Sequence, residues 1–270
     1  MIERGQGNLL TADVEALVNT VNCVGVMGRG VALQFKQAFP ENFRRYEQAC
    51  RADEVQTGRM FVFETSTLTN PKYIINFPTK RHWRAKSRLE DIESGLVALI
   101  GEVRGRAIRS IAVPPLGCGS GGLRWSDVKP RIEEAFHSLP EVRLMLFEPN
   151  GAPRTTAMPV ATPQPKMTPA RAALVLAMEQ YGIPGYRLTL LEIQKLAYFL
   201  QMAGAPLKLD WRKQQYGPYA EALNHVLQRM EGHYTRGYGD RSRHASISPL
   251  PDAINAAREY LASAPEAAPS

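Results

Sequence analysis

The sequence predicts an α/β domain followed by a smaller, mainly helical domain. Over residues 1–148, short segments rich in β-branched and aromatic residues alternate with helical periods, a pattern typical of helices covering a mixed or parallel sheet. Residues 149–167 are rich in Pro, Ala and Thr without periodicity, which predicts a linker. Apolar spacing is helical again within 168–262, and residues 263–270 predict a frayed tail.

Five segments of the first domain are expected to be strands, because each is short, apolar and bounded by turn residues. They cover residues 16–22, 60–64, 73–77, 110–115 and 143–148. Between them, apolar residues recur every three or four positions and predict helices. These repeats run through Val31, Phe35 and Phe39, then Phe43, Tyr46 and Cys50 after a break at Pro40, then Ile92, Leu96, Leu99, Ile100 and Val103, then Val128, Ile132 and Phe136. Ser126 is the expected N-cap of the last helix.

Helix boundaries in the second domain are marked by capping residues. Thr168 and Pro169 predict an N-cap and an N1 proline. Thr189 and Glu192 stand at capping-box spacing, and Gly204 ends that helix. The apolar stripe of this helix is Ile193, Leu196, Ala197 and Leu200, and that of the next is Tyr219, Leu223, Val226, Leu227 and Met230. The segment Tyr216-Gly217-Pro218-Tyr219 predicts a turn that opens the latter helix, with its aromatic rings in the core, and a contact surface is the alternative.

Composition narrows the class of protein. No run approaches the ~20 apolar residues of a membrane helix, and the start, MIERGQGNLL, lacks the pattern of a secretory signal. The three cysteines are too scattered for a disulfide framework or a CxxC metal site, so we expect a protein of the reducing cytoplasm. No His, Cys or carboxylate cluster has the spacing of metal ligands, so no metal is expected. We also expect no cofactor and no contact with a membrane. The net charge of +7 permits a polyanionic ligand but does not establish one.

Two glycine-rich loops each leave a predicted strand and enter a predicted helix. The first loop begins after Asn22, the last residue of the segment VNTVN. The second lies in PPLGCGSGGLRW, residues 114–125. Glycines let backbone N–H groups approach phosphate oxygens, and a helix N-terminus favours negative charge. Neither loop carries a Walker A motif or a dinucleotide fingerprint. Together they predict one phosphate-bearing ligand at the strand ends, with plain turns as the alternative.

The segments GNLLTADVEALVNTVN, GVMGRGVALQFK and PPLGCGSGGLRW, in this order, resemble the macrodomain family, whose members bind ADP-ribose. Within that family the chain most resembles the DarG-type DNA ADP-ribosyl glycohydrolase antitoxins, which are related to the human terminal ADP-ribose protein glycohydrolase. The resemblance covers residues 1–148. It implies a three-layer α/β/α sandwich around a mixed sheet, with an ADP-ribose cleft at the strand ends.

Carried over residue by residue, the resemblance places Asn8 and Leu9 at the adenine, although the family usually has an acidic residue where this chain has Asn8. Asn22 falls beside the distal ribose, where its amide would fix the sugar. Asn19 is expected instead to have a structural role at the strand end. The other residues implied in ADP-ribose binding are Gly28, Gly30, Val31, Thr79, Gly117, Cys118, Gly119, Ser120 and Gly121.

Common glycosidases use a pair of carboxylates, but neither glycine loop of this chain contains an Asp or Glu residue. Catalysis must therefore use other groups. The resemblance implies Lys80 as the catalytic residue, assisted by Asn22. Its amine could attack the anomeric carbon, or its ammonium could protonate or stabilise the leaving base. The human enzyme adds an acidic residue after the GCG run, where this chain has Ser120-Gly121-Gly122. Without the resemblance, Lys80 would be an ordinary surface lysine.

Two neighbouring side chains leave alternatives open. Trp83 stands among cations, which suits stacking on an unpaired base, or else it closes the edge of the core. Cys118 could be mistaken for a nucleophile, but no histidine is placed to activate it, and packing of the loop is favoured.

The resemblance also implies the substrate and partner: ADP-ribose on a thymine ring nitrogen of single-stranded DNA, installed by a DarT-type toxin. The segments IQKLAYFLQ (193–201) and QYGPYAEAL (215–223) resemble a helical module of antitoxins, which implies toxin binding by residues 168–262. Two other functions stay open: a non-catalytic ADP-ribose reader that acts through protein contacts, and a nucleic-acid-binding protein that only shares the scaffold.

Overall fold

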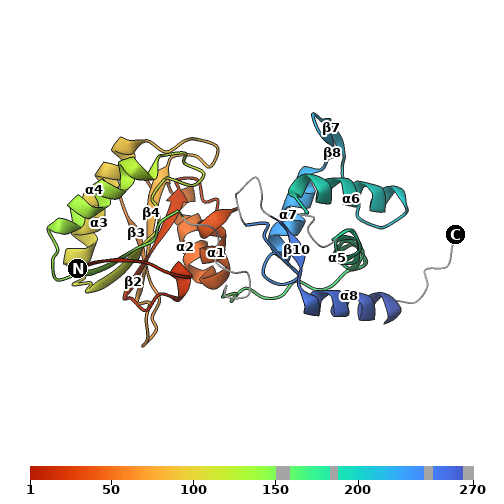
Figure 1. Ribbon diagram of the computed structural model, residues 1–270, viewed down its shortest axis with the longest axis horizontal. Coiled ribbons are helices and arrows are strands. Elements are labelled where there is room, and N and C mark those ends of the chain that lie inside the picture. Colours follow the sequence, from red (N-terminus) through yellow and green to blue (C-terminus); the bar gives the residue numbers. More distant parts are fainter. Residues whose placement is uncertain (150–158, 183–187, 240–245, 264–270) are drawn as a thin grey trace. The chain divides into compact units, whose positions relative to one another are not determined.

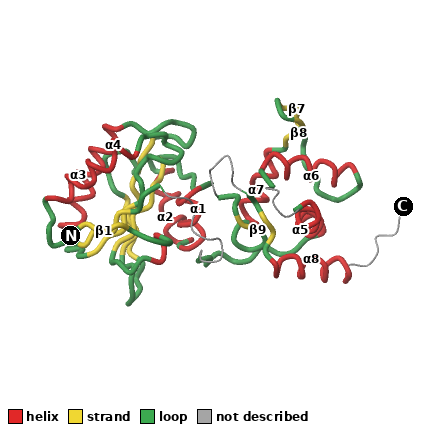
Figure 2. Tube along the Cα trace, in the orientation of Figure 1, coloured by secondary structure: helices red, strands yellow, loops and turns green. Residues whose placement is uncertain are grey.

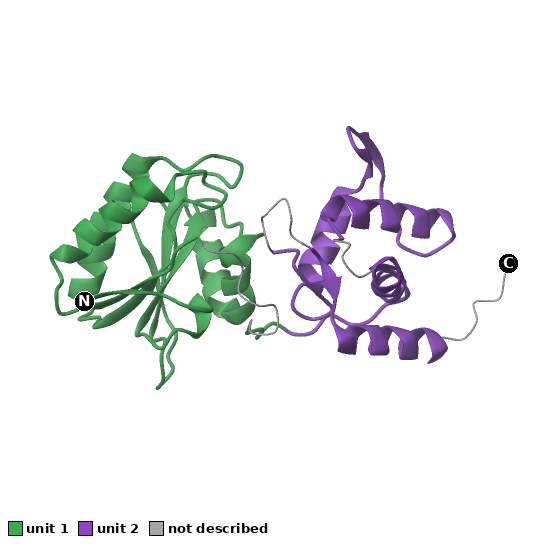
Figure 3. Cartoon of the chain, viewed as in Figure 1, with its two compact units in different colours: residues 1–162 green, residues 163–270 purple. Residues whose placement is uncertain are grey.

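The computed structural model describes residues 1–149, 159–182, 188–239 and 246–263. The chain divides into two compact units, Met1–Thr162 and Pro163–Ser270 (Figure 3). Residues 150–158 of the predicted linker and nearly all of the predicted tail lie outside the described residues. The contacts of the described end of the linker include a bond from the Ala161 N–H to the Gln37 carbonyl at 2.8 Å and one from the Tyr234 hydroxyl to the Pro165 carbonyl.

A six-stranded sheet forms the centre of the first unit, in the order β1-β6-β5-β2-β4-β3 (Figure 1). Its strands are β1 Ile2–Arg4, β2 Ala16–Asn22, β3 Phe61–Glu64, β4 Tyr73–Lys80, β5 Ser110–Val113 and β6 Arg143–Leu146. Every neighbouring pair is parallel except β3 with β4, which is antiparallel. The expected mixed sheet is therefore confirmed, with its antiparallel strand at one edge.

Helices cover both faces of this sheet (Figure 2). One face packs against α3 Leu89–Gly105 and α4 Trp125–His137, and the other against the 3-10 turn η1 Leu9–Thr11, α1 Gly30–Ala38 and α2 Pro40–Arg51. Because both faces are covered, alternate residues of the central strands enter different cores: Ile111 and Val113 face α3 and α4, whereas Ala112 faces η1 and α1. This is the three-layer sandwich that the resemblance implies.

Three buried asparagines join the sheet to α2. The Asn19 amide of β2 donates to Asn76 Oδ1 of β4 at 3.0 Å, and the Asn76 amide donates to Asn42 Oδ1 of α2 at 2.7 Å. All three side chains are fully buried. Buried amides must find partners inside the protein, so these bonds fix how β2, β4 and α2 meet. Asn19 thus has a structural role, but in the middle of β2 and not at the strand end where the sequence placed it.

The structure corrects several expectations for the first unit. β4 continues to Lys80 through Pro78 instead of ending at Phe77. A proline is tolerated there because the pairing with β3 ends at Asn76, so that side of β4 has become an edge. Ser126 is not an N-cap, because α4 begins at Trp125. The N-cap position is Arg124, whose side chain makes no capping hydrogen bond. The three-residue elements β1 and η1 are too short to produce a periodic signal.

The second unit contains four helices among its described residues. They are α5 Pro169–Tyr181, α6 Leu190–Met202, α7 Glu221–Met230 and α8 Pro251–Ser263. Thr168 accepts from the Arg171 N–H as an N-cap, and Thr189 and Glu192 form the predicted capping box. The remaining elements are short strands: β7 Arg212–Gln214, β8 Gly217–Tyr219, β9 Thr235–Arg236 and β10 Ser248–Pro249.

The prediction for Tyr216 to Tyr219 is wrong. These residues belong to the β7–β8 hairpin, and the Tyr216 side chain is 65% exposed instead of buried. The helix then begins at Glu221, after Tyr219. The last helix, α8, was not expected from the sequence. Its stripe is made mainly of alanines, including the buried Ala253 and Ala257, and alanines give a weak apolar period.

A glycine in α3 determines how closely this helix approaches the sheet. A Cβ on Gly95 would lie 2.3 Å from Phe77 Cζ, whereas a Cβ on Gly101 of the same helix would meet nothing within 4 Å. We expect Gly95→Ala to lower the free energy of unfolding by about 1–3 kcal/mol through overpacking. Gly101→Ala is the matched control and should raise it by about 0.5–1 kcal/mol. Urea unfolding of residues 1–162 measures both; equal effects would contradict this packing.

Candidate active site

Strand pairing brings the two predicted catalytic residues together. β2 and β4 are parallel neighbours, so their carboxyl ends lie at the same edge of the sheet. The register pairs Asn22 with Lys80 after an irregularity between Val21 and Asn22. Thr79, the residue before Lys80, is buried and its hydroxyl donates to the Val21 carbonyl at 3.3 Å. In the structure, Thr79 thus stabilises the ends of the two strands.

Lys80 is not a surface lysine, because only 9% of it is exposed. Its Nζ donates to the Trp83 carbonyl at 3.1 Å and to the Ser120 carbonyl at 3.5 Å. The first bond closes the turn that follows β4, and the second reaches the second glycine loop. The ammonium group therefore lies where the ends of β2 and β4 meet the loop after β5.

Asn22 shapes the first glycine loop. Its Oδ1 accepts from the Val24 and Val26 N–H groups at 3.0 and 3.3 Å, and its amide donates to the Val26 carbonyl at 2.6 Å. The buried Tyr46 hydroxyl donates to the Asn22 carbonyl at 2.5 Å and anchors the loop to α2. These bonds make Asn22 the organiser of residues 23–26. Contact between Asn22 and a ribose stays a prediction. The Asn22 amide has a second N–H, which is the donor that such a contact would use.

The first loop leads into the N-terminus of α1. Gly30 has φ +60°, a conformation that side chains other than glycine rarely adopt. Among the described residues, no side chain caps this end of the helix, whose N-cap position is Arg29. Gly28 precedes it, and Val31 packs partly buried against the core beneath. Uncapped N–H groups and the helix dipole make this end suitable for an anion.

The second loop has the geometry of a backbone cradle. Gly117 and Gly122 have φ +69° and +79°, and the Leu123 N–H donates to the Gly117 carbonyl at 3.1 Å. A Cβ on Gly121 would lie 2.1 Å from Ser87 Oγ, so no larger residue fits. Within the described part of the chain, the N–H groups of Gly119, Ser120 and Gly121 have no intramolecular acceptor. Successive N–H groups of this kind form an anion-binding concavity.

Asn8 and Leu9, the predicted adenine contacts, lie at the start of η1. Asn8 caps η1, since its Oδ1 accepts from the Leu10 N–H at 3.0 Å. Leu9 is buried in the core with Val14, Leu17 and Phe35. The side-chain oxygen of Asn8 thus already accepts a hydrogen bond from the backbone. Its contact with adenine stays a prediction.

Cys118 is a packing residue of the second loop. Burial raises the pKa of its thiol to about 11, and its Sγ donates to the Leu116 carbonyl at 3.4 Å. A thiol with this pKa is almost entirely protonated near neutral pH and is a poor nucleophile. The expectation that Cys118 packs the loop therefore agrees with its electrostatics.

Trp83 is 43% exposed and does not close the core. Its indole lies beside two neighbours of the same turn: the Arg84 guanidinium carbon is 4.4 Å from a ring centroid, and the His82 ring is 5.5 Å away. No group of three or more His, Cys, Asp or Glu side chains suited to a metal occurs within the described ranges. In the same ranges, every helix is too short or too polar to cross a membrane.

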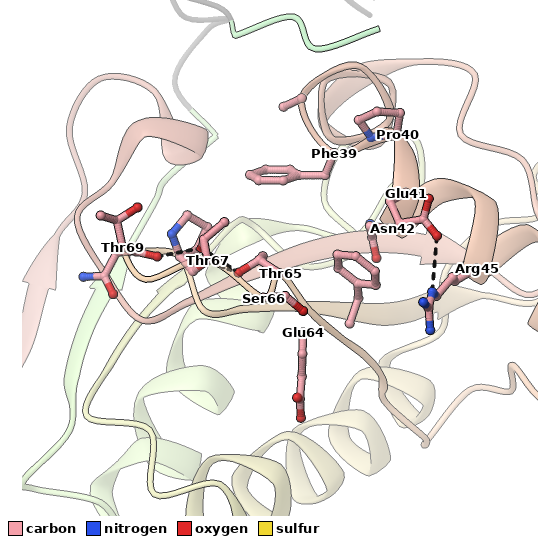
Figure 4. A pocket seen from close by; sticks show the side chains of 14 residues that line it. Phe39, Pro40, Glu41, Asn42, Arg45, Glu64, Thr65, Ser66, Thr67 and Thr69 are labelled. Atoms are coloured by element: carbon pink, nitrogen blue, oxygen red, sulfur yellow. Dashed lines mark hydrogen bonds and ion pairs between the residues drawn. The ribbon is translucent and has the colours of Figure 1, made fainter.

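A separate pocket of about 560 Å³ lies near the start of β4, away from Lys80 (Figure 4). It lies between the junction of α1 and α2 and the loop from β3 to β4, and its walls include Phe39, Asn42, Phe63 and Thr65. No predicted site residue lines it. The strand ends at Asn22 and Lys80 therefore stay the candidate site, because the two predicted catalytic residues lie there and not in this pocket.

The chain is similar to known proteins along most of its length. The Macro domain family model matches residues 18–132. A DNA ADP-ribosyl glycohydrolase of Thermus aquaticus is 52% identical over 267 residues, which is 99% of this chain and 74% of the relative.

Two solved structures are also similar. The macrodomain of Mycobacterium tuberculosis DarG is 57% identical, with a TM-score of 0.55 over 56% of this chain and 99% of that structure. Thermosipho africanus DarTG in complex with ADP-ribose is 30% identical, with a TM-score of 0.51 over 57% of this chain and 43% of that structure. The chain therefore belongs to the macrodomain family and, within it, to the DNA ADP-ribosyl glycohydrolases.

Proposed function

We propose that this enzyme removes ADP-ribose from a thymine ring nitrogen of single-stranded DNA, with Lys80 as its catalytic residue. The position of Lys80 Nζ carries the proposal: it is nearly buried, beside Asn22, and in contact with the Ser120 carbonyl of the second glycine loop. The choice of thymine rests on the resemblance to DarG-type antitoxins. The Thermosipho africanus structure supports ADP-ribose as the group held in the cleft.

The two loops would hold the diphosphate of ADP-ribose. Its oxygens would accept from the N–H groups of Gly119, Ser120 and Gly121, while the uncapped start of α1 supplies positive potential. Because the Ser120 carbonyl also accepts from Lys80, a diphosphate in this loop brings the distal ribose toward Nζ. Asn22 would keep the first glycine loop in place, because its side-chain oxygen accepts from the N–H groups of residues 24 and 26.

The surroundings of Nζ favour Lys80 as an acid. An ammonium group has only donors, and two backbone carbonyls accept from this one. In the proposed step, the bond from the anomeric carbon to the base nitrogen breaks, and its electron pair stays on the nitrogen, which takes a proton from Lys80. A water oxygen bonds to the carbon, and the proton that it loses returns to the Lys80 amine. The positive charge stabilises the departing base.

The helical unit is proposed to bind and neutralise a DarT-type ADP-ribosyltransferase toxin. Three exposed apolar side chains, Leu191, Phe199 and Met202, lie at helical spacing along α6, and Tyr216 is exposed on the nearby hairpin. Exposed apolar patches mark protein contacts more often than chance. Phe199→Asp should weaken capture of the purified toxin by the full chain. Undiminished capture by Phe199→Asp combined with Met202→Asp would exclude this face.

Removal of the Lys80 side-chain nitrogen is the direct test of the enzyme. Lys80→Ala should lower the rate of ADP-ribose release from an ADP-ribosylated thymidine oligonucleotide by at least about 10²-fold, as expected for loss of a general acid. Calorimetry should show that free ADP-ribose still binds. Lys72→Ala is the matched control, because Lys72 lies at the other end of the same strand and pairs with Glu15. A mutant as fast as the parent would remove Lys80 from the mechanism.

The two roles of Lys80 differ in whether a covalent adduct forms. If Lys80 acts as an acid, borohydride added during turnover should leave the mass of the protein unchanged. An adduct carrying ADP-ribose on Lys80 would instead establish the amine as a nucleophile.

Gly121→Ala tests the second loop as the diphosphate site. The new Cβ cannot be accommodated between Ser87 Oγ and the Gly117 carbonyl, which lie at 2.1 and 2.2 Å, so the loop must move. We expect the Kd for ADP-ribose to rise by about tenfold or more, measured by calorimetry. Gly101→Ala, far along the chain in α3, should bind as the parent does. Unchanged affinity in Gly121→Ala would place the diphosphate elsewhere.

We expect Cys118 to make the stability of the protein fall at alkaline pH. Burial raises the pKa of Cys118 from 9.0 to about 11, so the folded state holds its proton more tightly than the unfolded state. Its contribution to stability is therefore present below pH 9 and is lost as pH rises from 9 to about 11. Cys118→Ser should flatten the fall of thermal stability in this window. A parallel fall in mutant and parent would show that Cys118 does not contribute.

A further inference from the structure

The turn after Lys80 presents an aromatic ring within a basic surface. Trp83 is 43% exposed, and Arg84 lies over its indole with a 4.4 Å separation. Residues 81–88 contain four basic side chains and no acidic one, and all four are exposed. These are Arg81, Arg84, Lys86 and Arg88. Since Arg81 pairs with Asp91 at 3.2 Å, the positive charge that remains is centred on Arg84 and the residues after it.

The backbone of this turn is tied to the proposed reacting group. The Trp83 carbonyl accepts from Lys80 Nζ at 3.1 Å, so the turn cannot move without breaking a contact of the catalytic ammonium. The Cys23 N–H donates to the Arg81 carbonyl at 3.3 Å, which joins the turn to the loop after β2. That loop exposes Val24 and Val26, which are 44% and 40% exposed. The two connected segments that follow β2 and β4 therefore expose one aromatic and two aliphatic side chains.

We propose that Trp83 stacks on an unmodified nucleobase next to the modified thymidine, and that Arg84 contacts a phosphate of the same strand. This rests on the proposed function, which places the scissile bond at Lys80. Given that position, the DNA strand must pass the turn of residues 81–84. Base–aromatic stacking tolerates any sequence, and arginine neutralises the backbone, which is how proteins hold single strands without reading their bases.

The inference predicts that the enzyme distinguishes a strand from a single nucleoside. ADP-ribosylated thymidine offers only the group that is cut, whereas an ADP-ribosylated oligonucleotide also offers a base for Trp83. We expect Trp83→Ala to lower kcat/KM for the oligonucleotide by about 5- to 150-fold, mainly through KM, as for loss of one base stack. For the nucleoside, kcat/KM should change less than about twofold. Trp83→Phe should restore most of the oligonucleotide activity.

Arg84 gives an independent measurement. Arg84→Ala should reduce the dependence of log KM on log salt by about 0.7 for the oligonucleotide, the value for one phosphate contact on a single strand, and leave the nucleoside unaffected. The control is Val97→Ala, which changes an exposed side chain on the outer surface of α3. Calorimetry with ADP-ribose checks that each variant is folded.

The outcomes separate this inference from the proposed function. If the parent releases ADP-ribose from neither substrate, the proposed function is wrong. If the parent cleaves nucleoside and oligonucleotide with equal kcat/KM, or if Trp83→Ala slows both equally, the proposed function stands and Trp83 only supports Lys80. A drop confined to the oligonucleotide, rescued by phenylalanine, would establish the stacking site.

Discussion

The site depends on the parallel pairing of β2 with β4. The hydrogen bonds of this ladder place Asn22 opposite Lys80, although 57 residues separate them in the chain. A shift of one residue would turn every side chain of one strand to the opposite face. Such a shift would bury Lys80 in one of the cores or direct Asn22 away from its loop. The pairing of Asn22 with Lys80 is therefore a property of register before it is a property of any single side chain.

Buried amides secure that register where apolar packing alone would not. Leucine and isoleucine would pack tolerably in a neighbouring register, but the bond from Asn19 to Asn76 exists only when the two residues lie opposite each other. Asn42 extends the same bonds to α2, whose Tyr46 then anchors the carbonyl of Asn22. Polar contacts thus tie both the middle of the sheet and the first glycine loop to the same helix, α2.

Local signals in the sequence were enough for most of the fold. Strand β2 was predicted to the residue, and capping residues located the starts of α5 and α6, because such signals depend only on neighbours. The extension of β4 through Pro78 could not be predicted, since it requires knowing that β3 ends at Asn76. The hairpin at Tyr216 was missed for a similar reason: Gly-Pro suggests a turn but does not specify which strands it joins.

The candidate residues were named from motifs, yet what each one does in the fold needed the structure. From the sequence, Lys80 is one of several cations in a row. In the structure it is buried, and its two carbonyl acceptors come from the turn that brings Trp83 back toward it and from Ser120 of the second glycine loop. Asn22 and Asn8 likewise proved to organise the backbone of the segments that follow them. The predicted binding role of Thr79 now stands beside an observed one at the strand ends.

A substrate held from both sides of its scissile bond has a consequence for turnover. The glycine loops would hold only the nucleotide half, and the turn of residues 81–88 would hold only the DNA half. While the bond is intact, the contacts of the two halves act together, and each raises the effective concentration of the other at its site. Once the bond is broken, each product keeps only its own contacts and dissociates with its own, weaker affinity. Binding of this kind favours intact substrate over products without any change in the protein.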